Sequence, residues 1–505
     1  MVDKKNFSKC AEFLMFFLSM GFLAFMMGYN LMHSALWYDE WVEYYISSAG
    51  IKDGSMYKMI IKTLQPPLYN FIMHFWLKIN SSLFWFRMFN VILGVLSGFV
   101  LYKTLKRLFN FCVASISLIV FGCTYQWIYC VQECSEYCLM LFFLFLMLFF
   151  YFEVSREYTF GNLIWFVLSC VGAIYSQYGS AFIVLPVLIA IYWKYFNWTN
   201  DKTKLLQVNL LYILCAILFA FPLYIFYLKK QIGNEVGTGF LLNNLNILDF
   251  LTIPGNIIGY FLNCRAGKPW MNFWTIISIL LLVGSVYISC NRNTEKEQKK
   301  FVVLTFIAYI LHYILVKLQI YAVSTTGNSA GFYCRYSYFY LPLFCILVPI
   351  LIMGLLDHTL VFGHNLKVAV FIVIGMCSMG VFLSVNTTLN NWNKTYDDEF
   401  AKVWIDSKGW NVDTFLVAHA DYGFDYYIGG NVEINSKVDS NKIHRLSNSD
   451  YAELTEYPEA FWVWSTNDWD GQVFDIIIEN AKGQGYIINQ IRDSGSKGQL
   501  CYIER

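Results

Sequence analysis

The chain is organised around the stretch Leu36-Trp37-Tyr38-Asp39-Glu40-Trp41, which follows the first long apolar run at 11–32. Two adjacent carboxylates lie here among aromatic residues, at the point where a hydrophobic segment ends. A carboxylate pair in this position is typical of a solvated loop end, an ion ligand or a catalytic base. The local sequence leaves these three alternatives open.

The composition is that of a membrane protein. The 505 residues are 57% hydrophobic and 14% charged, with a mean hydropathy of +0.47, whereas soluble domains carry about a quarter charged residues. Aromatic residues make up 19% of the chain, as expected where many helix ends lie at the depth of the lipid headgroups. A net charge of +1 without a long basic stripe argues against a nucleic-acid partner.

About eleven apolar runs approach the length of about 20 residues that a membrane-spanning helix needs. They are 11–32, 84–102, 111–130, 137–154, 160–176, 178–194, 207–228, 272–289, 301–321, 336–356 and 367–386. The first run is too long for a signal-peptide core and no small-residue cleavage site follows it, so we expect a retained helix. The prediction is a polytopic α-helical membrane protein.

Basic residues predict the orientation, because short cytoplasmic loops are rich in lysine and arginine. Placing residues 4–9 in the cytoplasm puts the other basic clusters there too, at 103–107, 156, 194–204, 292–300 and 367. Three larger pieces, 33–83, 229–271 and 387–505, are then external. We expect a bacterial plasma membrane, a cytoplasmic N-terminus and an external C-terminal region.

Two segments of the first external piece are predicted to form helices on the membrane surface. In residues 34–49, the aromatic side is expected to anchor the helix and the acidic side to face water. The aromatic side has Trp37, Trp41, Tyr44 and Tyr45, and the acidic side has Asp39, Glu40 and Glu43. Residues 66–80 are expected to face lipid with Leu68, Phe71, Ile72, Phe75, Trp76 and Ile79.

The chain changes character after residue 386. Residues 387–505 are more charged and alternate short apolar stretches with helical patterns, which predicts a small external α/β domain. The expected strands include 414–418, 461–464, 486–488 and 500–503, and the expected helices include 397–407, 422–428 and 472–481. The predicted domain boundary thus separates 1–386, the membrane domain, from 387–505.

Further polar groups lie at the predicted external ends of the spans. They are Gln65 to Tyr69, the segment Tyr129 to Tyr137 with Gln132 and Glu133, Arg87, and Arg335 with Tyr336. Each arginine can snorkel to the headgroups or bind a phosphate with its planar fork. The acidic and amide groups either orient a polar ligand or simply end two helices. Cys130, Cys134 and Cys138 share a helical face, but without a histidine we assign no metal site to them.

Taken in order, these motifs resemble the GT-C superfamily of polytopic glycosyltransferases, and in particular bacterial relatives of protein O-mannosyltransferases and aminoarabinose transferases. The segments that carry the resemblance are Trp37 to Glu40, Gln65 to Tyr69, Arg87, Gln132 to Tyr137, Tyr175 to Tyr178 and Arg335 with Tyr336. Gln65 stands where the family usually has histidine, and Ser135 where it has arginine. Both departures remove a potential cation from the site.

The resemblance implies a hexosyl- or pentosyltransferase that moves a sugar from a polyprenyl-phosphate donor to an acceptor hydroxyl on the external face, with inversion. It implies Asp39 as general base with Glu40 beside it, and Arg335, Arg87 and Tyr336 on the donor phosphate. Substrate-orienting roles would fall to Gln65, Tyr69, Gln132, Glu133 and Tyr137, with a divalent cation as an optional ligand and the loop 229–271 as a cover. The alternative is a transporter or flippase of a lipid-linked or small polar solute, a class that keeps ionisable residues at the bilayer midplane.

Overall fold

The structure is a computed structural model. It describes residues 4–32, 34–122, 124–198, 202–232, 250–251, 253–254, 257, 268–291, 294–321, 337–358, 395–446, 456–466, 472–493 and 498–505. The chain forms two compact units, of which the first comprises Met1–Leu31 and Ile46–Leu389. The second comprises Met32–Tyr45 and Asn390–Arg505. The predicted boundary between residues 386 and 387 lies outside the described residues.

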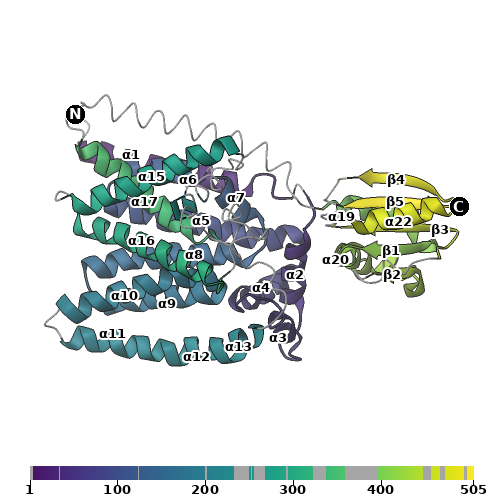
Figure 1. Ribbon diagram of the computed structural model, residues 1–505, viewed down its shortest axis with the longest axis horizontal. Coiled ribbons are helices and arrows are strands. Elements are labelled where there is room, and N and C mark those ends of the chain that lie inside the picture. Colours follow the sequence, from purple (N-terminus) through teal and green to yellow (C-terminus); the bar gives the residue numbers. More distant parts are fainter. Residues whose placement is uncertain are drawn as a thin grey trace. The chain divides into compact units, whose positions relative to one another are not determined.

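The first unit is a helical bundle, in which α5, α8, α9, α10 and α16 lie side by side (Figure 1). Its longer helices are α1 (Lys4–Gly28), α5 (Leu83–Leu108), α8 (Glu136–Arg156), α9 (Phe160–Ser176), α10 (Ala181–Trp198), α15 (Lys268–Cys290), α16 (Lys296–Lys317) and α17 (Tyr340–His358). The shorter ones are α3 (Ser55–Ile60), α4 (Leu68–Ile79), α6 (Phe111–Gly122) and α7 (Tyr125–Gln132). A further helix, Lys202–Gln231, includes α11 (Lys202–Cys215), α12 (Phe221–Leu223) and α13 (Lys229–Gln231).

Among the described residues, six helices are long and apolar enough to cross a membrane, and seven if the bent pair Phe111–Gly122 and Gln126–Gln132 is one span. These helices support a multi-pass membrane protein. Helices also occupy the predicted ranges 160–176 and 272–289, and α17 covers 340–356 of the predicted range 336–356. The predicted span 367–386 lies outside the described residues, and the count of eleven stays a prediction.

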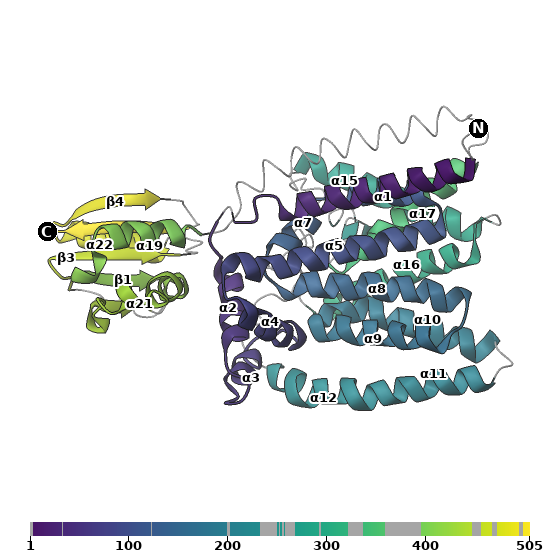
Figure 2. The same cartoon turned by 180° about the vertical axis from the view of Figure 1, so that it is seen from behind.

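Polar contacts near the C-terminus of α5 show the direction in which the neighbouring helix α1 runs. Near its C-terminus, Lys106 pairs with Glu12 of α1, and Arg107 Nε lies 2.5 Å from Glu153 Oε1 of α8. Helix α1 therefore runs antiparallel to α5, and the two lie along each other in Figure 2. Gly98 allows their close approach, since a Cβ there would lie 2.1 Å from Leu23 Cδ2 and the leucine side chain would have to shift.

Helix α4 has the stripe that its sequence predicts. None of the six residues of that stripe is buried, and Phe75 and Ile79 are 60% and 70% exposed. The opposite face is buried and includes Tyr69, Asn70 and His74. Two indoles hold α4 to α5: the rings of Trp76 and Trp85 stack at 4.3 Å, and each Nε1 donates to the other residue's carbonyl, at 2.8 and 3.1 Å. At 12 residues, α4 is too short to span a bilayer.

The second unit contains a five-stranded sheet in the order β2-β1-β3-β5-β4. The strands are β1 (Asp413–Val417), β2 (Ile443–Arg445), β3 (Ala460–Ser465), β4 (Ile487–Asp493) and β5 (Gln499–Glu504). Strand β1 is parallel to β2 and β3, whereas β5 is antiparallel to β3 and β4. The helices are α2 (Tyr38–Ser48, through residue 45), α19 (Asp397–Asp406), α20 (Ala420–Phe424), α21 (Val432–Asn435) and α22 (Gln472–Gly483).

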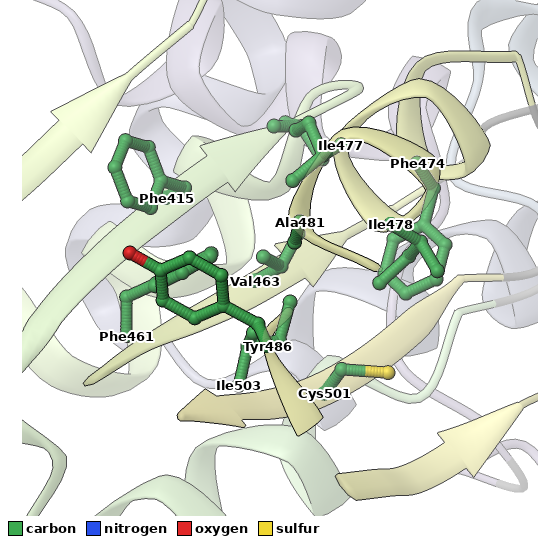
Figure 3. Close-up of a cluster of buried hydrophobic side chains, with 11 residues drawn as sticks. Phe415, Phe461, Val463, Phe474, Ile477, Ile478, Ala481, Tyr486, Cys501 and Ile503 are labelled. Carbon is green, nitrogen blue, oxygen red and sulfur yellow. The ribbon is translucent and has the colours of Figure 1, made fainter. Parts of the chain in front are cut away.

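Strand alternation builds a hydrophobic core on each face of this sheet. On one face, Phe415, Phe461 and Val463 pack with the apolar side of α22 (Figure 3). On the other, Leu416, Trp462 and Trp464 pack with α19 and α20. Burial on both faces explains why the strand segments read as almost continuous apolar runs.

The carboxylate of Asp397 is fully buried at the start of α19. Its oxygens accept hydrogen bonds from Trp464 Nε1 at 3.0 Å and Thr466 Oγ1 at 2.6 Å. The hydroxyl of Thr395 lies 2.8 Å from the same carboxylate and 2.6 Å from the carbonyl of Leu36. Asp397 thus connects the sheet to the segment that precedes α2. Burial raises its pKa from 3.8 to about 6, against the opposing effect of these hydrogen bonds.

The raised pKa predicts a pH-dependent stability. The folded state binds the proton of Asp397 more tightly than the unfolded chain does. The contribution of this protonation to the free energy of unfolding is therefore full below pH 4 and is lost as the pH rises through 6. The rise in pKa from 3.8 to about 6 corresponds to about 3 kcal/mol in the free energy of unfolding. Because Asp397→Asn cannot ionise, its destabilisation relative to the wild type should shrink by about that amount between pH 4 and 7. Thermal unfolding of the full chain across this range measures it.

The matched control is Asp398→Asn, which changes the neighbouring exposed carboxylate of the same helix. Its stability relative to the wild type should stay constant over the same pH range. A constant difference for Asp397→Asn as well would contradict the raised pKa.

Candidate functional site

Helix α2 begins with a reciprocal cap that involves one carboxylate of the acidic pair. Trp37 is the residue before the helix and Glu40 is its third residue. The backbone N–H of Trp37 donates to Glu40 Oε2 at 3.3 Å, as in the carboxylate half of a capping box. Glu40 is fully buried and Glu43 is 2% exposed. The prediction that the acidic side of this helix faces water is therefore wrong for Glu40 and Glu43.

The aromatic residues of α2 pack on the C-terminal region, so the prediction that they anchor the helix in lipid is also wrong. The ring of Trp41 lies 5.2 Å from that of Tyr426, and Tyr44 contacts the same ring at 5.5 Å. Tyr45 donates its hydroxyl hydrogen to the carbonyl of Tyr422 at 3.0 Å. These contacts fix α2 through residue 45 as part of the second unit.

Asp39 is the second residue of α2 and is half-buried. It therefore lies at the positive end of the helix dipole. The charge of Asp39 also contributes to the raised pKa of Tyr38, after the larger effect of burial and together with Asp421. Asp39 thus lies in a polar and aromatic environment that includes residues of α20.

In the first unit, buried polar side chains bind the carbonyls at the end of α1. Arg87 is fully buried, and its Nη1 donates to the carbonyl of Leu31 at 2.9 Å. Gln132 Nε2 donates to the carbonyls of Met27 and Tyr29, at 3.2 and 2.9 Å. Such donors satisfy the carbonyls that a helix leaves unpaired at its C-terminus. Complete burial rules out snorkelling for Arg87.

The junction between α7 and α8 contributes to the same buried cluster. Asn90 Nδ2 donates to the carbonyl of Glu133 at 2.7 Å. The Glu133 side chain is fully buried, and Tyr137 is 5% exposed with its ring 5.1 Å from that of Tyr338. The structure therefore brings Arg87, Gln132 and Glu133 to one end of the bundle, as their predicted shared side of the membrane requires.

The segment at Gln65 is held by a residue that the sequence reasoning did not identify. Gln231 Nε2 donates to the carbonyls of Gln65 and Ile60, at 2.7 and 3.1 Å, and its Oε1 accepts from the hydroxyl of Tyr178 at 2.7 Å. Tyr69, the second residue after the two prolines, is fully buried. Gln231 ends an apolar helix. A polar amide at the end of an apolar run is the signal in the sequence that could have identified it.

The remaining predicted site residues, Arg335 and Tyr336, lie outside the described residues, as does most of the loop 229–271. Within the described part of the chain, no group of three His, Cys, Asp or Glu side chains is placed to hold a metal ion. The roles predicted for Asp39, Glu40, Gln65, Tyr69, Arg87, Gln132, Glu133 and Tyr137 all stay predictions.

Residues 64–226 match the family model described as dolichyl-phosphate-mannose-protein mannosyltransferase. The matched range contains Gln65, Tyr69, Arg87, Gln132, Glu133 and Tyr137, whereas Asp39 and Glu40 precede it. No curated protein matches the chain in sequence.

The fold is similar to that of ArnT from Cupriavidus metallidurans over nearly the whole of both chains. The crystal structure of ArnT bound to undecaprenyl phosphate matches with a TM-score of 0.53 and 12% identity, covering 96% of this chain and 97% of that one. The apo crystal structure matches with a TM-score of 0.56 and 12% identity over 98% of each chain. Together with the family model, these matches confirm the predicted resemblance to the GT-C glycosyltransferases.

The capping geometry predicts that Glu40 is needed for folding through its side-chain oxygen. Glu40→Gln keeps an acceptor for the N–H of Trp37, so α2 should form and the melting temperature should stay close to that of the wild type. Glu40→Ala removes the acceptor and should destabilise the chain by about 1–2 kcal/mol. Thermal unfolding of the purified full chain compares the three. Equal melting temperatures for Glu40→Ala and the wild type would exclude a capping role.

Proposed function

We propose that this protein is a membrane glycosyltransferase that moves a sugar from a polyprenyl-phosphate donor to an acceptor hydroxyl on the external face. The observation that carries the proposal is the ArnT-like fold along nearly the whole chain, in one case with undecaprenyl phosphate bound to ArnT. The half-buried Asp39 in the first turn of α2 supports it, since a carboxylate that is partly accessible to solvent can act as a base on an acceptor hydroxyl.

In the proposed reaction, Asp39 takes the proton of the acceptor hydroxyl as the oxygen attacks the anomeric carbon. A new carbon–oxygen bond forms, and the bond from that carbon to the phosphate oxygen breaks. The polyprenyl phosphate leaves with the bonding electron pair. Because the leaving group is already an anion, it needs no second carboxylate to protonate it, unlike the leaving alcohol of the two-carboxylate hydrolases. A direct displacement of this kind inverts the anomeric configuration.

The leaving phosphate requires positive charge near the headgroup level. We assign this role to Arg335 and Tyr336, with Arg87 as a second cation. The assignment of Arg87 has a structural constraint, because its guanidinium already holds the Leu31 carbonyl. Its charge can still contribute to the field at a phosphate, since charges act over longer distances where water is excluded. Gln65, Tyr69, Gln132, Glu133 and Tyr137 would orient the donor sugar or the acceptor.

We place the enzyme in a bacterial plasma membrane with a cytoplasmic N-terminus and an external C-terminal domain. The division of the bundle supports this orientation. Lys106 and Arg107 pair with acids at one end of α5, and Lys194 of α10 binds the carbonyl of Ser155 at the end of α8. Arg87, 20 residues before Arg107 in the same helix, lies about 30 Å away along its axis. We assign residues 1–386 to the membrane domain and residues 387–505 to the external domain.

Asp39→Asn should lower the rate of sugar transfer by about 10²–10⁴-fold, because the amide cannot accept the acceptor's proton. Expression and melting temperature should stay at the wild-type level. Transfer is measured with purified protein and a panel of radiolabelled polyprenyl-phosphate sugars, guided by mass spectrometry of the co-purified lipid.

The matched control is Asp53→Asn, an exposed carboxylate in the same predicted external segment, which should transfer at the wild-type rate. Undiminished transfer by Asp39→Asn would remove Asp39 as the base. Transport of a solute without a glycosidic product would instead favour the transporter alternative.

A single displacement predicts that the product has the anomeric configuration opposite to that of the donor. NMR of the isolated product, with a donor of known configuration, determines it from the couplings of the anomeric proton. A product that retains the donor's configuration would indicate a covalent sugar–enzyme intermediate and a second, nucleophilic carboxylate.

A further inference from the structure

His419 occupies a special position in the sheet of the second unit. The chain passes from β1 to its neighbour β2 and then returns across β1 to β3, so the strand order reverses at β1. Open α/β sheets bind ligands outside the carboxyl ends of their strands at such a reversal. Strand β1 ends at Val417, and His419 follows two residues later. The topology therefore places His419 where this class of sheet carries functional side chains.

The backbone at this point is in a rarely populated conformation. Ala418 and His419 have φ values of 47° and 69°. Positive φ is uncommon for residues other than glycine, and such residues persist where the surrounding structure holds them in place. In consequence, the chain turns sharply between β1 and α20, and the imidazole of His419 remains partly exposed to solvent.

The imidazole contacts the first residue of α2. Its ring centre lies 4.0 Å from that of Tyr38, with the two planes inclined by 33°. Tyr422 adds a third ring, 5.8 Å from Tyr38 and 6.4 Å from His419. The charged groups that face His419 are Asp421 and Asp39, and both favour its protonated form. Partial desolvation has the larger effect and lowers the pKa of His419.

We infer that His419 is a positioning residue for the proposed reaction: it stacks on Tyr38 and thereby fixes the first turn of α2, which carries Asp39. This inference rests on the proposed function. It gives the C-terminal domain a direct part in sugar transfer, because the base is then oriented by a residue nearly 400 positions later in the chain.

The physical reason is the precision that general-base catalysis requires. A displacement of about 1 Å at a reacting group can cost about 10²-fold in rate. The cap from Glu40 fixes the backbone of the first turn on one side of Asp39. The stack of His419 on Tyr38 fixes the residue on the other side. Removal of either ring should therefore misplace Asp39 without unfolding the chain.

A double-mutant cycle on kcat tests the inference. His419→Asn removes the ring but tolerates positive φ, and Tyr38→Ala removes the partner ring. Each single variant should lower kcat about tenfold with an unchanged KM for the donor lipid, as expected when only the base is displaced. The double variant should also lose about tenfold, because the second substitution finds the stack already broken. An additive loss of about a hundredfold would overturn the inference.

His444 provides the matched control. It is a histidine of the same sheet whose ring also stacks on an aromatic ring, that of Phe415 at 4.7 Å, and it lies 2.7 Å from a carboxylate oxygen of Asp413. His444→Asn should keep kcat within twofold of the wild type. A loss of activity equal to that of His419→Asn would indicate a general effect on the domain and would also overturn the inference.

A second measurement needs no donor. In the full chain with labelled histidines, His419 is assigned by the NMR signal that disappears in His419→Asn. Its titration midpoint should move to lower pH in Asp39→Asn, because a facing negative charge has been removed. An unchanged His419 midpoint would overturn the inference. Undiminished transfer by Asp39→Asn would remove Asp39 as the base, and transport of a solute without a glycosidic product would remove the proposed function itself; the cycle on kcat mimics neither result.

Discussion

The arrangement of the second unit depends on one buried carboxylate. A carboxylate out of contact with water must be satisfied by several donors, or its burial destabilises the fold. Asp397 meets this requirement with Trp464 and Thr466 at the end of β3, which donate to its oxygens, and the hydroxyl of Thr395 lies within hydrogen-bond distance of both the carboxylate and the carbonyl of Leu36. The backbone N–H of Ala35 donates to the carbonyl of Thr395 at 3.1 Å. Helix α20 packs closely against this carboxylate, since a Cβ on Gly423 would lie 2.6 Å from Asp397 Cγ.

Helix α2 belongs partly to each unit. Residues through Tyr45 cluster with the C-terminal region, whereas Ile46 and the residues after it cluster with the bundle. Within the bundle, His74 Nδ1 lies 2.9 Å from the carbonyl of Ser47, and Asn70 Nδ2 donates to the hydroxyl of the same residue at 3.3 Å. Residues of α2 through Tyr45 thus contact Tyr422 and Tyr426 of the C-terminal region, whereas Ser47 contacts α4.

Periodicity and composition predicted the apolar helices and the exposed stripe of α4, because these depend on how each segment meets lipid or water. They failed for α2. Trp41, Tyr44 and Glu40 form an amphipathic pattern that is equally compatible with a membrane surface and with a protein partner, and the partner is nearly 400 residues away in the sequence. Gln231 and Asp397 were missed for the same reason: a buried polar residue is recognised by its hydrogen-bond partners, and these lie in distant segments. The short strand β2 has too few residues to show an alternation.

The adjacent acids Asp39 and Glu40 at the start of α2 have different environments in the structure. Successive helical residues point about 100° apart, so Asp39 and Glu40 cannot address the same neighbour. Glu40, at the third helical position, turns back to the N–H of Trp37 and is fully buried, so it has little access to a substrate. Asp39, one position earlier, stays half-exposed next to Tyr38 and opposite His419. A cap that uses one carboxylate to hold the helix start makes the orientation of the other reproducible. The structure thus gives Glu40 a capping role at the helix start, and only Asp39 of the pair keeps the exposure that the proposed base requires.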